Sequence, residues 1–82
     1  SAASDVYKRQ LEYLQTCDAT SLKAKDIAGG MVISSRKVSG AIRKLVSDGF
    51  VDKYGQNPVI YSLTEKGKNF DINAYKENLN NE

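Results

Sequence analysis

The stretch Ser34–Gly49, SSRKVSGAIRKLVSDG, carries the pattern that decides the fold. Its apolar residues recur at i, i+3, i+4 and i+7, the spacing of one buried helical stripe, and they are Val38, Ala41, Ile42 and Leu45. Ser34 or Ser35 can cap the amino terminus, because a serine oxygen accepts hydrogen bonds from the free amides of the first turn. Gly49 stands where a left-handed residue closes a helix. We therefore expect an amphipathic helix over residues 34–48.

The opposite side of this helix is polar, basic and free of acidic residues. At about 100° per residue it presents Arg36, Ser39, Gly40, Arg43 and Ser47. A basic and sterically open helix fits the major groove of DNA, which is wide enough to admit it. A solvated surface helix that happens to carry cations would show the same pattern, so this face alone leaves both interpretations open.

The length and composition restrict the class of protein. The 82 residues suffice for one domain with one modest core, and no apolar run approaches the roughly 20 residues of a membrane span. A single cysteine and no histidine exclude a disulfide framework and argue against a zinc site or a histidine-based catalytic unit. No paired carboxylates and no nucleotide-binding loop are recognisable. We expect no enzyme, no cofactor, no metal and no membrane association, and a cytoplasmic location, because a free thiol suits a reducing compartment.

The positive charge is concentrated in the middle of the chain. Residues 23–64 contain seven basic and three acidic residues, a difference of +4, whereas the whole chain carries +2. This excess suits a polyanionic partner. An excess of this size is also ordinary for such a stretch, so the functional interpretation depends on the charges sharing the 34–48 helix.

The first ten residues require separate treatment. Asp5–Gln10, DVYKRQ, resembles the translated end of a transposase adapter used in making sequencing libraries, and artefactual extensions do not belong in a functional argument. We therefore divide the chain into a non-native extension (1–10), a domain (11–70) and a C-terminal helical tail (71–82).

Two helices are expected before the 34–48 helix. Helical periodicity predicts the first over about residues 4–17, with Cys17 as a buried packing residue, and a short second one over residues 23–30. Gly29 and Gly30 are poor helix formers and are expected to end the second helix. Only three residues then separate it from the 34–48 helix, which is the arrangement of a helix-turn-helix.

After Gly49 the period changes to that of extended strands. Residues 50–54 and 59–63 are rich in aromatic and β-branched residues, and the connection between them is short, so we expect a hairpin that packs against the helices. A two-residue bridge is possible at residues 21–22. Thr64 can cap a further helix, and an apolar stripe continues into the tail with Phe70, Ile72, Tyr75 and Leu79.

These segments resemble the winged helix-turn-helix family, in particular small bacterial and archaeal regulators of the MarR-like type. The resemblance is carried by KAKDIA (23–28), SSRKVSGAIRKLVSDGFV (34–51) and YSLTEKGK (61–68), and it covers roughly residues 11–70. It implies a mainly α fold with a small β-hairpin: a three-helix core, a wing sheet of two or three strands and an additional C-terminal helix.

The resemblance also implies sequence-specific binding of double-stranded DNA by a transcriptional regulator. The 34–48 helix would enter the major groove, and the 52–61 hairpin would be the wing. The DNA-contacting residues would then lie on the helix, on its flanks and on the wing, and they are Ser34, Ser35, Arg36, Lys37, Ser39, Gly40, Arg43, Lys44, Lys53, Tyr54, Gln56 and Asn57. The forked guanidinium groups can hold guanine O6 and N7 or phosphate oxygens.

Two features depart from the family pattern. Many members have a glycine four residues after the alanine of the second helix, where this chain has Val32. A β-branched residue disfavours positive φ, so we expect Gly29 and Gly30 to provide the freedom for the turn instead. The wing is short, and its tip carries no arginine.

The family resemblance leaves two questions of assembly. Related regulators often dimerise through terminal helices, which implies a homodimer formed by the first helix and the tail. A different class of function is also open, in which the basic helix contacts an acidic protein or RNA in an interaction or assembly module.

Overall fold

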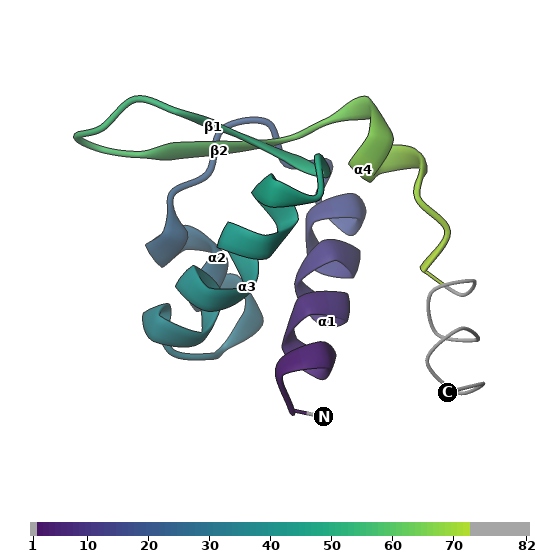
Figure 1. The fold of residues 1–82 in the computed structure, drawn as a ribbon. Helices are drawn as coiled ribbons and strands as arrows, with labels where there is room; N and C mark the ends of the chain where they lie inside the picture. The colour runs from purple at the N-terminus through teal and green to yellow at the C-terminus, as the bar shows by residue number, and fades with distance from the viewer. Residues whose placement is uncertain (1, 73–82) are drawn as a thin grey trace.

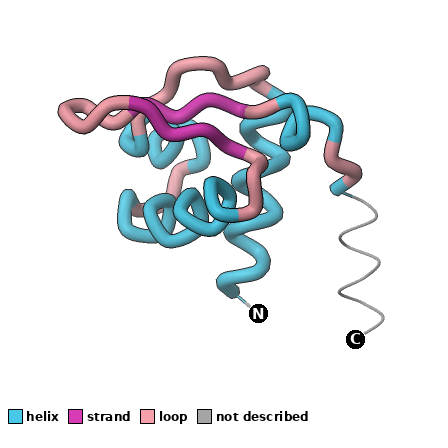
Figure 2. The backbone as a smooth tube through the Cα atoms, turned by 45° about the horizontal axis from the view of Figure 1, so that its top comes forward, coloured by secondary structure: helices cyan, strands magenta, loops and turns pink. Residues whose placement is uncertain are grey.

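The structure, a computed structural model, describes residues 2–72. Its elements in chain order are α1 (Ala2–Thr16), α2 (Ala24–Met31), α3 (Ser35–Ser47), β1 (Val51–Tyr54), β2 (Ile60–Leu63) and α4 (Glu65–Asn69). The first three helices pack together, and the hairpin lies across one end of them with its tip on the side away from α4 (Figure 1). Figure 2 shows the two strands running side by side, with the loop that joins them reaching beyond the helices as the tip of a wing. The expected mainly α fold with a wing is confirmed.

Helix α3 is held by the burial of one face. The four residues of the predicted apolar stripe are all buried: Val38, Ala41, Ile42 and Leu45. Three of them share a core cluster with Leu11 and Leu14 of α1 and Ile27 of α2. Full burial of a leucine or isoleucine side chain contributes about 1.5–3 kcal/mol, so this stripe is a main source of stability and fixes which side of α3 faces outward.

Both ends of α3 are capped as the sequence predicts. The Ser34 Oγ accepts a hydrogen bond from the Lys37 amide at 3.3 Å. At the other end Gly49 has φ 86°, and the Phe50 amide donates to the Leu45 carbonyl at 2.9 Å. The chain therefore reverses within three residues and enters β1.

The turn between α2 and α3 closes differently from the prediction. Gly29 and Gly30 lie inside α2, and it is Val32 that adopts the left-handed conformation, with φ 57° and ψ 47°. The amides of Val32 and Ile33 both donate to the Ala28 carbonyl. The expectation that the glycines supply the freedom is wrong, because the capping bonds and the packing of Ile33 against the core together impose the left-handed conformation on Val32.

The hairpin is antiparallel, with Val51 opposite Leu63. Both strands begin one residue later than predicted. At β1 the reason is that the Phe50 amide closes α3. Leu22 forms an isolated antiparallel bridge with Tyr61, in which each amide donates to the other carbonyl, at 3.0 and 2.7 Å. The possible bridge at residues 21–22 is thus confirmed, and it ties the segment before α2 to the wing.

Thr64 and Gly67 fix α4 against the end of α3. The Thr64 hydroxyl donates to the Gly49 carbonyl at 2.7 Å and accepts from the Gly67 amide at 3.0 Å, which confirms the predicted cap. The Thr64 amide also donates to the Phe50 carbonyl at 3.0 Å. Gly67 is buried, and a Cβ at this position would overlap the Phe50 carbonyl group, so the backbone of α4 approaches that carbonyl directly.

One glutamine joins α1 to α4. The Gln15 side-chain amide donates to the carbonyls of Gly67 at 2.8 Å and Phe70 at 2.9 Å. The Phe70 ring lies 4.7 Å from the Phe50 ring, measured between centroids, and Ile72 also packs against the core. The part of the predicted tail helix beyond residue 72 lies outside the described residues.

The first ten residues continue α1 into the core. Tyr7 and Gln10 are buried; the Gln10 Nε2 donates to the Val38 carbonyl at 3.4 Å, whereas its Oε1 has no hydrogen-bond partner among the described residues. The boundary at residue 10 stays a prediction. Cys17 is exposed, so the expectation that it packs inside is wrong; the helix ends one residue earlier, and the chain turns at Asp18 with φ 51°.

We expect Gly67→Ala to lower the free energy of unfolding by about 1–3 kcal/mol, the range for overpacking a tight site, because its methyl group would overlap the Phe50 carbonyl. Gly29→Ala is the matched control. A Cβ there meets nothing within 4 Å, so it should raise the stability by about 0.5–1 kcal/mol through helix propensity. Urea denaturation measures both, and equal effects of the two changes would contradict the packing described for α4.

We expect Val32→Gly to raise the free energy of unfolding by about 1 kcal/mol. Glycine removes a left-handed strain of about 1–3 kcal/mol, offset by about 0.4–1 kcal/mol for the greater freedom of the unfolded chain. Thermal and urea denaturation should agree on the sign. A variant less stable than the parent chain would show that the left-handed conformation of Val32 is unstrained.

Candidate nucleic-acid interface

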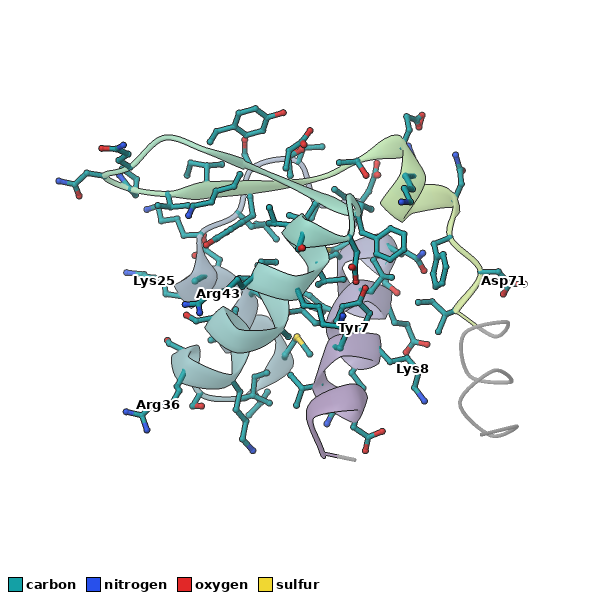
Figure 3. All side chains as sticks on the ribbon, in the orientation of Figure 1. Tyr7, Lys8, Lys25, Arg36, Arg43 and Asp71 are labelled. Atoms are coloured by element: carbon teal, nitrogen blue, oxygen red, sulfur yellow. The ribbon has the colours of Figure 1, made fainter. Side chains whose placement is uncertain are left out.

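The outer face of α3 is an exposed cationic surface. Ser35, Arg36, Ser39, Gly40 and Arg43 are all exposed, and Figure 3 shows both arginines extending from the same side of the helix. Neither guanidinium makes an ion pair or hydrogen bond with the described part of the chain. Each therefore has its hydrogen-bond donors exposed to solvent.

The amino terminus of α3 lies at one end of this surface. The cap uses the Lys37 amide, while Ser35 and Arg36 occupy the first helical positions, where backbone amides have no acceptor within a helix. The helix dipole adds a partial positive charge at the same end. An anion can therefore bind here to backbone donors as well as to side chains.

The hollow between α3 and α1 is lined by four of the predicted residues, two of which also belong to the outer face. Lys37 and Lys44 line this hollow of about 440 Å³, together with Val6, Tyr7, Arg36, Gly40 and Ala41. The Lys44 Nζ lies 3.7 Å from the Asp48 carboxylate and 5.8 Å from the centroid of the Tyr7 ring. This ion pair is solvent-exposed and contributes little, but it directs Lys44 away from the two arginines.

The wing contributes exposed polar groups and an acid. Lys53, Tyr54, Gln56 and Asn57 are all exposed. The Tyr54 hydroxyl donates to the Asp52 carboxylate at 3.1 Å, and this hydrogen bond, with the negative charge of Asp52, raises the pKa of Tyr54 above its ordinary value. Tyr54 thus remains a neutral aromatic residue with 55% of its surface exposed.

Lys25 of α2 is one of the seven basic residues between positions 23 and 64 and is not among the residues predicted to contact DNA. It is exposed, and Figure 3 shows it extending to the same side as Arg43. The sequence itself predicts that Lys25 is exposed, because Lys25 precedes the buried Ile27 by two positions and so lies about 200° from it around the helix. Its proximity to α3 depends on how the two helices cross, which the periodicity does not give.

These elements together define a winged helix-turn-helix domain. Helices α2 and α3 are joined by the short turn at Val32, the outer face of α3 is open, and the hairpin extends beside it. Among the described residues, no helix has the length and apolar character needed to span a membrane, and no cluster of side chains is suited to hold a metal ion.

The fold is shared with solved structures of a transcription regulator. No protein-family model matches the sequence, and no curated protein shows significant similarity to it. A similar structure is that of MepR, a transcription regulator of the Staphylococcus aureus multidrug efflux pump MepA, with a TM-score of 0.66 and 22% identity over 93% of this chain. Another is the S. aureus MepR–DNA complex, with a TM-score of 0.64 and 20% identity over 93% of this chain. The match spans 57% and 64% of the length of those two chains.

Proposed function

We propose that this chain is the DNA-binding domain of a transcriptional regulator, and that α3 recognises a specific duplex sequence in the major groove. The observation that carries the proposal is the exposed face of α3, with two arginines that make no ion pair within the described residues and with no acid. A major groove about 12 Å wide admits such a helix. The MepR–DNA complex, in which a protein of the same fold is bound to DNA, supports the proposal.

The residues divide into two roles. Arg36 and Arg43 can each hold guanine O6 and N7 or two phosphate oxygens, and these are the candidates for sequence recognition. Ser34 and Ser35 bind a phosphate with the amides of the first turn. The remaining cations on the flanks, on α2 and on the wing supply salt-sensitive affinity for any duplex, and they are Lys25, Lys37, Lys44 and Lys53.

The wing contributes less affinity than the helix. Its tip residues, Gln56 and Asn57, carry no charge, and the Asp52 carboxylate next to Tyr54 repels phosphate. We propose that the tip contacts the DNA backbone beside the groove through polar groups without penetrating the minor groove.

The proposal describes a binding protein of the cytoplasm rather than an enzyme. The structural neighbours are transcription regulators, and they support this choice. The proposal includes a homodimer formed by α1 and the C-terminal tail, whose residues 73–82 lie outside the described part of the chain.

The decisive experiment is a fluorescence-anisotropy titration of random and selected duplexes at several salt concentrations. Arg36→Ala/Arg43→Ala should weaken binding by at least about tenfold, and it should reduce the salt slope by about 0.9 for each arginine that contacts a phosphate. The control Lys8→Ala/Lys68→Ala also removes two positive charges, so it has the same net charge as the arginine variant. Figure 3 shows Lys8 on the opposite side from the arginines, and Lys68 pairs with Asp18, so this variant should lose less than about twofold.

Either of two results would overturn the proposal. One is a folded parent chain that does not bind duplex DNA at low salt, which would instead favour the protein-interaction module. The other is an equal loss in both double variants, which would show that only net charge matters and that α3 does not dock specifically.

Gly40→Ala separates stability from DNA contact. A Cβ at Gly40 meets nothing within 4 Å in the protein, so alanine should raise the stability by about 0.5–1 kcal/mol through helix propensity. If the backbone at Gly40 approaches the groove, the same methyl group should lower DNA affinity. Gly29→Ala adds an equally open methyl group on α2 and should leave affinity unchanged. Equal affinity for the parent chain and Gly40→Ala would place this turn of α3 away from the bases.

A further inference from the structure

Val32 combines two features that rarely occur together in a β-branched residue. Its backbone is left-handed, with φ 57° and ψ 47°, and 86% of its surface is exposed. The left-handed region is unfavourable for a branched side chain, whereas glycine or asparagine adopts it readily. Because the side chain is almost entirely in solvent, it gives the folded domain little packing in return.

The position of Val32 indicates where a compensating contact could form. It lies two residues before the Ser34 cap, and its neighbour Ile33 packs against the core, so the Val32 side chain is directed outward at the amino-terminal end of α3. The same end carries Ser35 and Arg36. An apolar side chain thus stands beside the polar and cationic surface proposed to meet DNA.

The surroundings of Val32 favour a nucleic acid over an apolar protein surface as its partner. Among the described residues the other large exposed apolar side chain is Tyr54 on the wing, and the neighbours Met31 and Ile33 are partly buried against the core. Val32 is therefore a single exposed apolar residue and not part of a broad apolar patch of the kind that marks protein interfaces. One exposed valine lies close in the chain to the serine and arginine donors at the start of α3. This combination fits a partner that presents one small apolar group among several hydrogen-bond acceptors.

We infer that Val32 is a specificity-determining residue that contacts the C5-methyl group of a thymine at the edge of the bound site. Thymine is the one base that presents a methyl group in the major groove, and apolar side chains distinguish it there. The left-handed backbone conformation sets the direction of the Val32 Cβ. The conformation that is unfavourable for valine is therefore also the one that would place its side chain against the thymine methyl group. The inference rests on the proposed function, because it requires the amino terminus of α3 to enter the groove.

The test uses the full chain and a duplex selected for tight binding from a random pool. Each thymine of that duplex is replaced in turn by deoxyuridine, which lacks only the methyl group. At one thymine the replacement should weaken binding by roughly fourfold, the factor expected for burying one methyl group. Val32→Gly should bind the thymine and deoxyuridine duplexes equally well, whereas Val32→Ile should keep the discrimination.

Val32→Asn provides a second variant that tolerates the left-handed conformation and lacks the apolar contact, so it should behave like Val32→Gly. The inference is overturned if no deoxyuridine replacement affects the parent chain, if Val32→Gly still distinguishes the two duplexes, or if it loses affinity for all duplexes alike. In each of these cases DNA binding that depends on Arg36 and Arg43 would leave the proposed function intact. Absence of duplex binding by the parent chain would reject both.

Discussion

The burial of a single stripe of α3 against α1 is the interaction on which the other features depend. A helix that buries one side must present the other, so the packing of residues such as Leu45 also aims Arg43 outward. The core is small and is shared by elements that are distant in sequence. Loss of volume in the stripe would therefore alter the orientation of the cationic face together with the stability. Stability and the candidate site are properties of the same helix.

The wing and α4 are positioned by a compact junction at the end of α3. Gly49 reverses the chain, the Phe50 carbonyl accepts from Thr64, and the missing side chain of Gly67 lets α4 pack directly on that carbonyl. The bridge between Leu22 and the wing adds a second attachment. The hairpin thus has a fixed direction relative to α3, although two strands alone would be only marginally stable. These attachments place the hairpin beside α3, so the helix and the wing can together form one surface.

The sequence predicts those features that depend on local chemistry. The α3 stripe follows from the helical period, and the roles of Ser34 and Gly49 follow from capping preferences. Features set by tertiary packing were missed. The left-handed Val32 results from capping bonds and the burial of its neighbour. The position of Lys25 on the same side as Arg43 (Figure 3) results from the crossing of two helices. Of the predicted residues of α3, Arg36 and Arg43 extend from the same side, whereas Lys37 and Lys44 border the hollow next to α1. Their role in DNA binding, like that of the wing, stays a prediction.

The double hydrogen bond of Gln15 has a chemical consequence for the lifetime of the fold. Both contacts use the side-chain nitrogen as donor, a role that a carboxylate cannot fill because it only accepts. Hydrolysis of this amide to glutamate, one of the slow lesions to which glutamine is prone, would turn two attractions into two repulsions against the carbonyls of Gly67 and Phe70. Deamidation at this position would therefore weaken the attachment of α4 to α1 and leave the packing of Phe70 and Ile72 to hold the segment that follows α4.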